Sequence, residues 1–593
     1  MKRIRQYIKN GKTFAVAVNV ALTIPFALFS LTSCIDEETP TEQASAEQVA
    51  SSGSSVKMLA NGLQSKMISY CNYYDDISSW YATQDWGYGC YMLIKETMLD
   101  GFPCSGTSYN YQNVYESASN LSSYTTPIYF YYYNLAALAN RVVKATEDAT
   151  TETMMEYRGI ALAYRALAYM DLALMFEFWE TGNAELNAQA SDILGLTVPI
   201  VTEKTTDEEA KNNPRADFTT MYRFIYSDLT TAKYLLAGYE RSGKNDINID
   251  VINGLLARFW ITLAARFERY PADLAKQKQA EGKDDGWKDL CINSATECYA
   301  KAKECAKAVI DAGYSPVTKE QWHNVNSGFN TANQAWVWDM RITSQEQYGA
   351  YWCSIMGCVA SEPTWAMPAY GNAYRCISSN LYAEIKKGDW RETSWIAPED
   401  AGAKTVPERY ATLLKDETAT SKTENTNFSR LPAYANLKFR SGSGSISDEK
   451  MGMMADIPLM RVEEMYFICM ECDMKTAGLE AGKKALEDFM NSYRMDSPAL
   501  YKSASDTKHK LLEEIIAQKY VELWGEGLMY NDYKRLGLPI IRNSENSNYI
   551  EPYNKINHQS NGCAQWLNFY IPDEARTYNQ ALAGKMNPNP TVQ

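Results

Sequence analysis

Histidine is scarce in this chain, which limits the catalytic chemistry that the sequence offers. Only His323, His509 and His558 occur in 593 residues, and none of them stands in the spacing of a metalloprotease or nucleophile motif. The sequence therefore predicts a protein that is not an enzyme and that has no cofactor. A glycosidase needs only two carboxylates, and this chain has 72 acidic residues. A glycan-degrading enzyme is therefore kept as the less favoured alternative.

Basic residues are also fewer than acidic ones. Residues 1–33 carry five basic groups and no acidic ones, which leaves 53 basic against 72 acidic residues, a formal charge of −19, in the rest of the chain. Proteins that bind nucleic acid need a basic surface, because the phosphate backbone dominates their affinity. We therefore expect no nucleic-acid partner.

The cysteines show no disulfide framework and no zinc motif. The chain has 13 of them, and Cys291, Cys298 and Cys305 recur every seven residues, which predicts that they share one buried face of a helix. Cys469 and Cys472 form a single Cys-x-x-Cys with neither a second pair nor nearby histidines. The sequence thus predicts no metal site at these residues.

A calcium loop is also missing. Asp246, Asn248 and Asp250 have the spacing of the start of such a loop, but Val251 stands where glycine is needed and Ala257 where glutamate is needed. Helix capping explains this pattern better. We expect Asp250 to cap a helix over Val251–Phe267.

The N-terminus has the order of a secretory signal peptide. An apolar stretch over Phe14–Leu31 is followed by Leu31-Thr32-Ser33-Cys34, a lipobox that resembles the site at which bacterial lipoproteins are lipidated and cleaved. The alternative is an uncleaved membrane anchor, against which Asn19 and Pro25 argue. We expect a signal peptide over residues 1–33, lipidation at Cys34 and a flexible tether over residues 34–55. The basic residues before the apolar stretch are Lys2, Arg3, Arg5, Lys9 and Lys12.

Beyond the tether, helical periodicity dominates and predicts a mostly α fold of stacked helix pairs. The pattern fades over residues 313–456, where only Gln334–Met340 suggests a short strand. We expect one domain over residues 56–593, with a helical scaffold at 128–312 and 457–540 and a loop-rich insertion at 313–456. The predicted helices are Ile128–Ala145, Glu152–Phe178, Phe218–Leu236, Val251–Phe267, Cys291–Ile310, Leu459–Met474, Glu480–Arg494 and Leu511–Trp524.

Several stretches in a fixed order resemble the SusD/RagB family, and the resemblance covers the mature chain from end to end. They are Arg165–Tyr169, Leu255–Arg258, Pro458–Tyr466, Asn491-x-x-Arg494, Gln518–Gly527 with Asp532 and Arg535, and Ile571-Pro572-x-Glu574. One departure is Leu523–Gly527, where the family more often has a phenylalanine before the Glu-Gly pair. We interpret Arg461, Glu463, Glu526 and Arg535 as structural residues that pair with one another or with backbone carbonyls.

The resemblance implies a SusD-like fold of tetratricopeptide-like helix pairs carrying a loop-rich region with few short strands. It also implies a cell-surface lipoprotein of the outer membrane that captures oligosaccharides and passes them to a TonB-dependent, SusC-like transporter. RagB suggests the alternative of oligopeptide capture for a RagA-like transporter. Asp36-Glu37-Glu38 resembles the acidic sorting signal of surface-exposed lipoproteins in the Bacteroidetes, and is also consistent with a solvated linker.

Two stretches are candidates for the oligosaccharide site, because sugars bind to flat aromatic rings flanked by polar groups. Aromatic core is the alternative interpretation of the first stretch, and core packing is favoured for Trp336 and Trp338. The first stretch supplies Trp80, Tyr81, Gln84, Asp85, Trp86 and Tyr88, and the second supplies Trp365, Tyr370, Asn372 and Tyr374.

Overall fold

The computed structural model describes residues 53–68, 87–106, 122–344, 355–415, 426–551, 553–559 and 562–588. The chain divides into two compact units, Met1–Ser45 and Ala46–Gln593, and all described residues belong to the second. The predicted signal peptide, the lipidation residue Cys34 and most of the tether lie outside the described residues. The first described helix begins at Gly53.

The described part of the chain is mostly helical, which confirms the predicted fold class. The α-helices are α2 Gly53–Ile68, α3 Gly87–Thr97, α5 Ser122–Ala145, α6 Glu152–Phe176, α7 Ala184–Gln189, α8 Asp207–Ala210, α9 Phe218–Leu235, α10 Ile249–Arg269, α11 Pro271–Ala280, α12 Ala295–Asp311, α13 Lys319–Trp322, α14 Ile355–Val359, α15 Met367–Gly371, α16 Ser379–Ala383, α18 Thr426–Ser429, α19 Glu449–Met453, α20 Val462–Ala477, α21 Leu479–Tyr493, α22 Lys508–Leu523, α23 Met529–Leu536 and α24 Asp573–Tyr578. Short 3-10 helices span Trp390–Ser394, Pro398–Asp400, Glu408–Tyr410, Gly442–Gly444, Tyr553–Lys555, Gln565–Leu567 and Gln580–Leu582.

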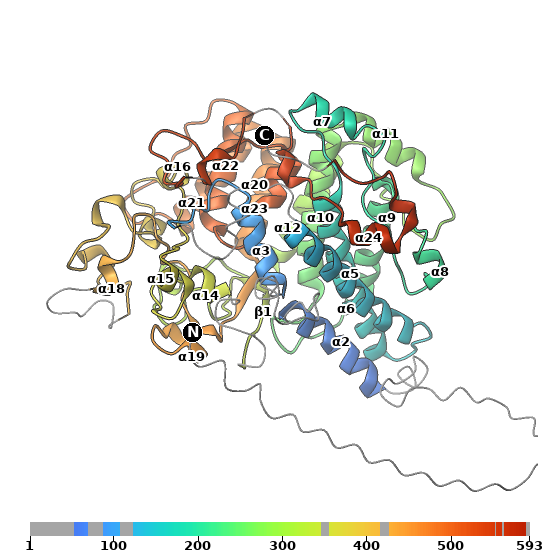
Figure 1. Ribbon diagram of the computed structural model, residues 1–593, viewed down its shortest axis with the longest axis horizontal. Helices are drawn as coiled ribbons and strands as arrows, with labels where there is room; N and C mark the ends of the chain where they lie inside the picture. The colour runs from blue at the N-terminus through green and yellow to red at the C-terminus, as the bar shows by residue number, and fades with distance from the viewer. Residues whose placement is uncertain are drawn as a thin grey trace, which may run out of the picture. The chain divides into compact units, whose positions relative to one another are not determined.

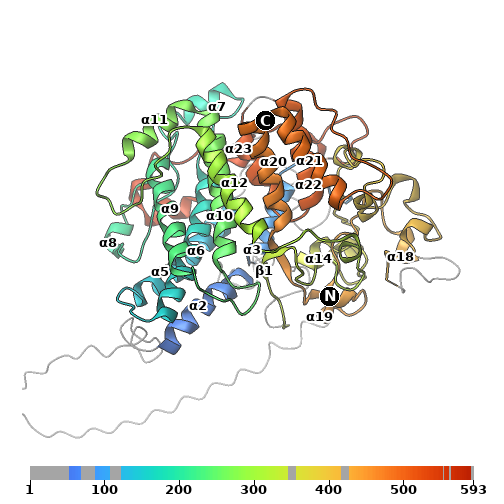
Figure 2. The ribbon, with the colours of Figure 1, turned by 180° about the vertical axis from the view of Figure 1, so that it is seen from behind.

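The long helices pack side by side in a continuous series. Helix α5 packs on α6, α6 on α9, α9 on α10, α10 on α12, α12 on α20, and α20 on both α21 and α22, and both views show this arrangement (Figures 1 and 2). Helices α12 and α20 are neighbours although residues 312–461 separate them in the chain. The irregular middle region therefore leaves and rejoins the helical scaffold between two neighbouring helices.

Most of helix α6 is buried within the scaffold. Among the described helices it is the one long and apolar enough to cross a membrane, yet 94% of its most apolar window is buried within the protein. Alanines at 161, 163, 166 and 168 are all buried, and such small side chains let neighbouring helices approach closely. These observations are typical of a core helix of a folded domain.

Three local predictions were wrong. Helix α12 starts at Ala295 with Ser294 as its N-cap, so the exposed Cys291 lies before the helix with a positive φ of 52° and does not share the face of Cys298. Asn248, not Asp250, caps α10: the Asn248 side chain accepts from the backbone N–H of Val251. An asparagine is as good a cap as an aspartate, and the helix begins two residues earlier than expected, at Ile249.

The third correction concerns Leu459, predicted as the start of a helix. Residues Ile457–Arg461 form strand β2, which pairs antiparallel with β1 (Trp336–Met340), and α20 begins only at Val462. A short, fully buried apolar run has no periodicity that separates strand from helix. A second small sheet joins β3 (Ile540–Ile541) to β4 (Asn557–His558).

A buried group of charged side chains joins the insertion to the scaffold. Arg461 pairs with Glu463 at 2.9 Å and with Glu526 at 2.9 Å, which confirms the structural role predicted for these residues. Arg535 pairs instead with Glu471 and Asp532. The group contains four cations and four carboxylates among the described residues, all buried: Arg391, Lys438, Arg461, Arg494, Asp389, Glu463, Glu522 and Glu526.

Candidate functional site

The candidate residues of the first aromatic stretch are mostly not described. Trp80, Tyr81, Gln84, Asp85 and Trp86 lie outside the described residues, as does the side chain of Tyr370 in the second stretch. The structure therefore describes the side chains of four candidates. They are Tyr88, Trp365, Asn372 and Tyr374.

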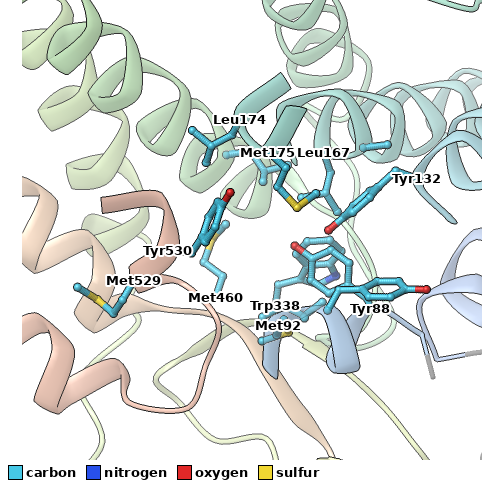
Figure 3. Close-up of a cluster of buried hydrophobic side chains, with 14 of the residues drawn as sticks. Tyr88, Met92, Tyr132, Leu167, Leu174, Met175, Trp338, Met460, Met529 and Tyr530 are labelled. Atoms are coloured by element: carbon cyan, nitrogen blue, oxygen red, sulfur yellow. The ribbon is translucent and has the colours of Figure 1, made fainter. Parts of the chain in front are cut away.

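Tyr88 lies in the helical core (Figure 3). It stands in the first turn of α3 and is 7% exposed, and its hydroxyl donates to the Asp171 carboxylate at 3.1 Å. Tyr132 donates to the same carboxylate at 2.7 Å, and Lys95 pairs with it at 3.2 Å. Burial and the Asp171 charge hold the pKa of Tyr88 well above its usual value. The hydrogen bond from Tyr88 to Asp171 therefore links α3 to α6.

The second stretch forms an exposed turn with a buried end. Asn372 is exposed and ends α15 in the left-handed conformation, at φ 51° and ψ 38°. Trp365 is half-buried, and its ring packs closely on Gly452. A Cβ added to Gly452 would lie 2.3 Å from a carbon of the Trp365 ring. Tyr374 is 1% exposed and packs in a satellite apolar cluster with Cys376. Asn372 therefore faces the surface, Trp365 is partly buried against the core, and Tyr374 supports the loop.

Residues 103–106 and 372–376 run side by side. The backbone N–H of Ser105 donates to the Tyr374 carbonyl at 3.0 Å, and the Ser105 hydroxyl accepts from the Tyr374 N–H at 3.0 Å. The same hydroxyl donates to the Asn372 carbonyl at 3.3 Å. The segment that follows α3 is thus joined directly to the second candidate stretch, although they are far apart in the sequence.

Helix α3 also touches the elements around this loop. A Cβ on Gly89 would lie 2.3 Å from Ile355 of α14 and 3.3 Å from Met340 of β1, so only glycine allows this close packing. Helices α2, α3 and α14 and strand β1 lie near one another in both views (Figures 1 and 2). The loop-rich insertion and the N-terminal helices therefore build one region together.

A polar pocket of about 90 Å³ opens in this region. It is lined by the end of α2, the turn before α10 and the end of β1, and its polar residues include Gln64, Asn245, Asp339 and Arg341 beside the ring of Trp338. Sequence reasoning missed the four polar residues and assigned Trp338 to the core. Strict strand alternation would put Trp338 and Asp339 on opposite faces, but the pairing of β1 is irregular between these two residues, and both line the pocket.

No metal centre is formed by the described residues. Within them no group of three or more histidine, cysteine, aspartate or glutamate side chains lies close enough to hold a metal ion. Cys469 and Cys472 both lie on α20, and burial raises the pKa of Cys469 to about 12, so its thiol keeps its proton. Asn248 serves as a helix cap, in line with the capping interpretation of the calcium-like spacing.

Sequence comparison matches two family models to this chain. The model described as "Starch-binding associating with outer membrane" matches residues 92–260, and the model described as "SusD family" matches residues 317–589. The two matches together cover most of the chain and leave a gap at residues 261–316. A comparison with curated proteins finds no match.

Solved structures are similar over nearly the whole chain. A SusD-like carbohydrate binding protein from Bacteroides vulgatus is 17% identical with a TM-score of 0.63, and the match covers 89% of this chain and 96% of that one. A SusD superfamily protein from Bacteroides thetaiotaomicron is 18% identical with a TM-score of 0.60, covering 90% and 99%. A SusD-like carbohydrate binding protein from Bacteroides fragilis is 14% identical with a TM-score of 0.58, covering 90% and 99%. At these identities the likeness shows a shared fold.

Proposed function

Because the chain belongs to the SusD/RagB family, we propose that it is a non-catalytic glycan-binding protein that captures oligosaccharides and delivers them to a TonB-dependent, SusC-like transporter. In this proposal a lipid on Cys34 anchors the protein to the outer membrane, facing the extracellular side. Two or three acyl chains suffice to hold a soluble domain on a bilayer. The tether after Cys34 keeps the binding domain close to its transporter.

The contact between residues 103–106 and 372–376 is the observation that carries the proposal. It joins the chain that leaves α3 to the loop that holds Trp365 and Asn372. The half-buried indole of Trp365, the exposed amide of Asn372 and the polar pocket at the end of α2 offer a ring and hydrogen-bonding groups, which is what a neutral sugar requires. We infer that Trp80 and Trp86 supply further platforms to the same site.

Isothermal calorimetry with the full mature domain tests the proposal. The glycan probes are maltoheptaose, cellohexaose, mannohexaose and xylohexaose, and the peptide probes are uncharged oligopeptides of similar length. We expect saturable binding of at least one glycan and no binding of the peptides. Binding of peptides alone would overturn glycan capture and favour oligopeptide capture for a RagA-like transporter.

Delivery to a transporter is tested in cells. Cys34→Ala should leave glycan binding by the purified domain intact and abolish uptake of the same glycan, because the domain is no longer held beside its transporter. Uptake that survives this change would show that the lipid is dispensable. A TonB-dependent receptor that copurifies with the wild-type protein would identify the partner directly.

The absence of a catalytic step is tested by prolonged incubation. Each glycan probe is mixed with a high concentration of purified protein and then separated by chromatography. We expect every probe to be recovered intact. The appearance of shorter oligosaccharides would contradict a pure binding function and favour a glycosidase that uses two carboxylates.

A further inference from the structure

Asp339 is a buried carboxylate without hydrogen bonds. It is 1% exposed at the end of β1, and neither of its oxygens has a hydrogen-bond partner in the structure. Most buried polar atoms in proteins are hydrogen-bonded, and an unpaired buried carboxylate is costly. Burial and the nearby Asp456 raise the pKa of Asp339 to about 6. Such a group needs a partner that the folded chain does not supply.

The nearest cation to Asp339, Arg341, forms a long ion pair with it but no hydrogen bond. The Arg341 guanidinium lies 3.8 Å from Asp339 and 3.9 Å from Asp456, and both distances are longer than a hydrogen bond. The Arg341 side chain is 37% exposed. Within the part of the chain that the structure describes, its guanidinium makes no hydrogen bond to the protein. The Arg341 guanidinium, which has five N–H donors, therefore lines the pocket without an acceptor from the described residues.

The neighbouring cations are already used elsewhere. Lys244 donates to the carbonyls of Asn333 at 2.5 Å and Trp336 at 2.7 Å. Arg241 donates to the carbonyl of Val337 at 2.7 Å. Both side chains donate hydrogen bonds to carbonyls of β1 or of the turn before it, and neither donates to the Asp339 carboxylate. Asp339 and Arg341 thus form an acceptor and a donor side by side, each lacking the hydrogen bonds that it is able to make.

The surrounding charges select a neutral occupant. Lys244, Arg241 and Arg341 disfavour a bound cation, whereas Asp339 and Asp456 disfavour a bound anion. A neutral group that donates and accepts hydrogen bonds at adjacent positions satisfies both sides, and two neighbouring hydroxyls of a sugar are such a group. The pocket wall adds an apolar surface from Trp338, which packs edge to face on Tyr164 at 5.8 Å.

We propose that this pocket is a saccharide subsite in which one hydroxyl of a neutral sugar donates to Asp339 while the adjacent hydroxyl accepts from Arg341. The Arg341 side chain is 37% exposed and lies 3.8 Å from the Asp339 carboxylate, so the two groups are close enough to engage neighbouring hydroxyls of one sugar ring. The pocket lies at the end of α2, and the aromatic stretch that includes Trp80 and Trp86 begins directly after that helix. This inference rests on the proposed function and names the polar residues of the site.

Calorimetry on two variants tests the subsite with whichever of the four glycan probes the wild-type domain binds. Asp339→Asn and Arg341→Gln should each weaken binding of that glycan at least tenfold. Asp339→Asn should leave the melting temperature unchanged or raised, since it removes an unpaired buried charge without changing volume. A residue with a merely structural role would lose stability instead. Arg409→Gln is the matched control, because Arg409 is 35% exposed and pairs with Glu399 outside this pocket.

The possible outcomes separate the two proposals. Wild-type binding together with wild-type affinity in both variants would overturn the subsite and leave glycan capture standing. A wild-type domain that binds none of the glycans would overturn glycan capture, and the subsite with it. Equal loss of affinity in Arg409→Gln and Arg341→Gln would also overturn the subsite, because the effect would then not depend on the pocket.

Discussion

Arg461 holds Glu526 through two hydrogen bonds at once. The Nε of Arg461 donates to Oε2 of Glu526 at 2.9 Å, and Nη2 donates to Oε1 at 2.9 Å, with both side chains buried. Arg461 ends β2, the strand that pairs with β1, and Lys438 of the insertion donates to the same carboxylate at 2.6 Å. Glu526 therefore connects the insertion, the sheet and the end of the scaffold.

Glu526→Gln should destabilise the domain by about 3–5 kcal/mol, because it removes one of the four carboxylates that balance four buried cations and takes away the ion-pair partner of Lys438. Urea unfolding at neutral pH measures this loss. Asp488→Asn is the control, since Asp488 pairs with Lys484 on the exposed face of α21, and a surface pair contributes about 0–1 kcal/mol. Similar losses in both variants would show that the buried pair has no special role.

The sequence predicted the helical scaffold well because periodicity is a local property. Helix α6 ends at Phe176 where Phe178 was expected, and α9 ends within one residue of its predicted end. Leu459 was misassigned because its strand forms only against β1, far away in the chain. A short run of apolar residues does not indicate whether a distant strand will pair with it, so whether the run forms a strand or a helix depends on tertiary structure.

The candidate site was less predictable for a related reason. Aromatic residues are visible in a sequence, but their burial is not, and Tyr88 is in the core because Asp171 on α6 accepts its hydroxyl. Asp339 was overlooked because a lack of hydrogen-bond partners is a property of the folded chain. Composition and spacing identify groups that are able to bind, whereas burial decides which of them remain available.

Loss of His323 should make the domain more resistant to acid. Burial, Arg440 and Lys319 lower the pKa of His323 to about 3, so the folded state keeps this imidazole neutral while the unfolded state binds a proton below about pH 6.5. Stability is therefore lost as the pH falls from about 6.5 toward 3. Between pH 6.5 and 5, wild type should lose about 2 kcal/mol more than His323→Asn.

Urea unfolding at several pH values measures this difference. His509 is the matched control, because its side chain is 81% exposed and contacts only Glu513 among the ion pairs of the described residues. His509→Asn should therefore keep the wild-type dependence on pH. If His323→Asn also keeps it, the imidazole is protonated in the folded state and its burial has been misjudged.

Trp80→Ala and Trp86→Ala should weaken glycan binding while leaving the melting temperature nearly unchanged. Each indole is proposed to stack on a sugar ring, and an alanine removes the ring without disturbing the scaffold. Calorimetry and thermal unfolding of the same samples measure the two effects. Trp338→Ala provides the contrast, because Trp338 is 1% exposed and removing a buried tryptophan costs about 3–5 kcal/mol. A comparably large stability loss in Trp80→Ala would assign that residue to the core.

Gly106→Ala tests whether glycan binding needs the contact between the N-terminal segment and the aromatic loop. A Cβ on Gly106 would lie 2.3 Å from the carbonyl oxygen of Asn372, so an alanine must push the two segments apart. We expect at least tenfold weaker binding of the glycan probe with a stability loss of only about 1 kcal/mol, because the scaffold helices are untouched. Gly62→Ala is the control: no atom lies within 4 Å of the position of its Cβ, and alanine in a helix gains about 0.5–1 kcal/mol over glycine. Unchanged affinity in Gly106→Ala would show that the two segments bind glycan independently or not at all.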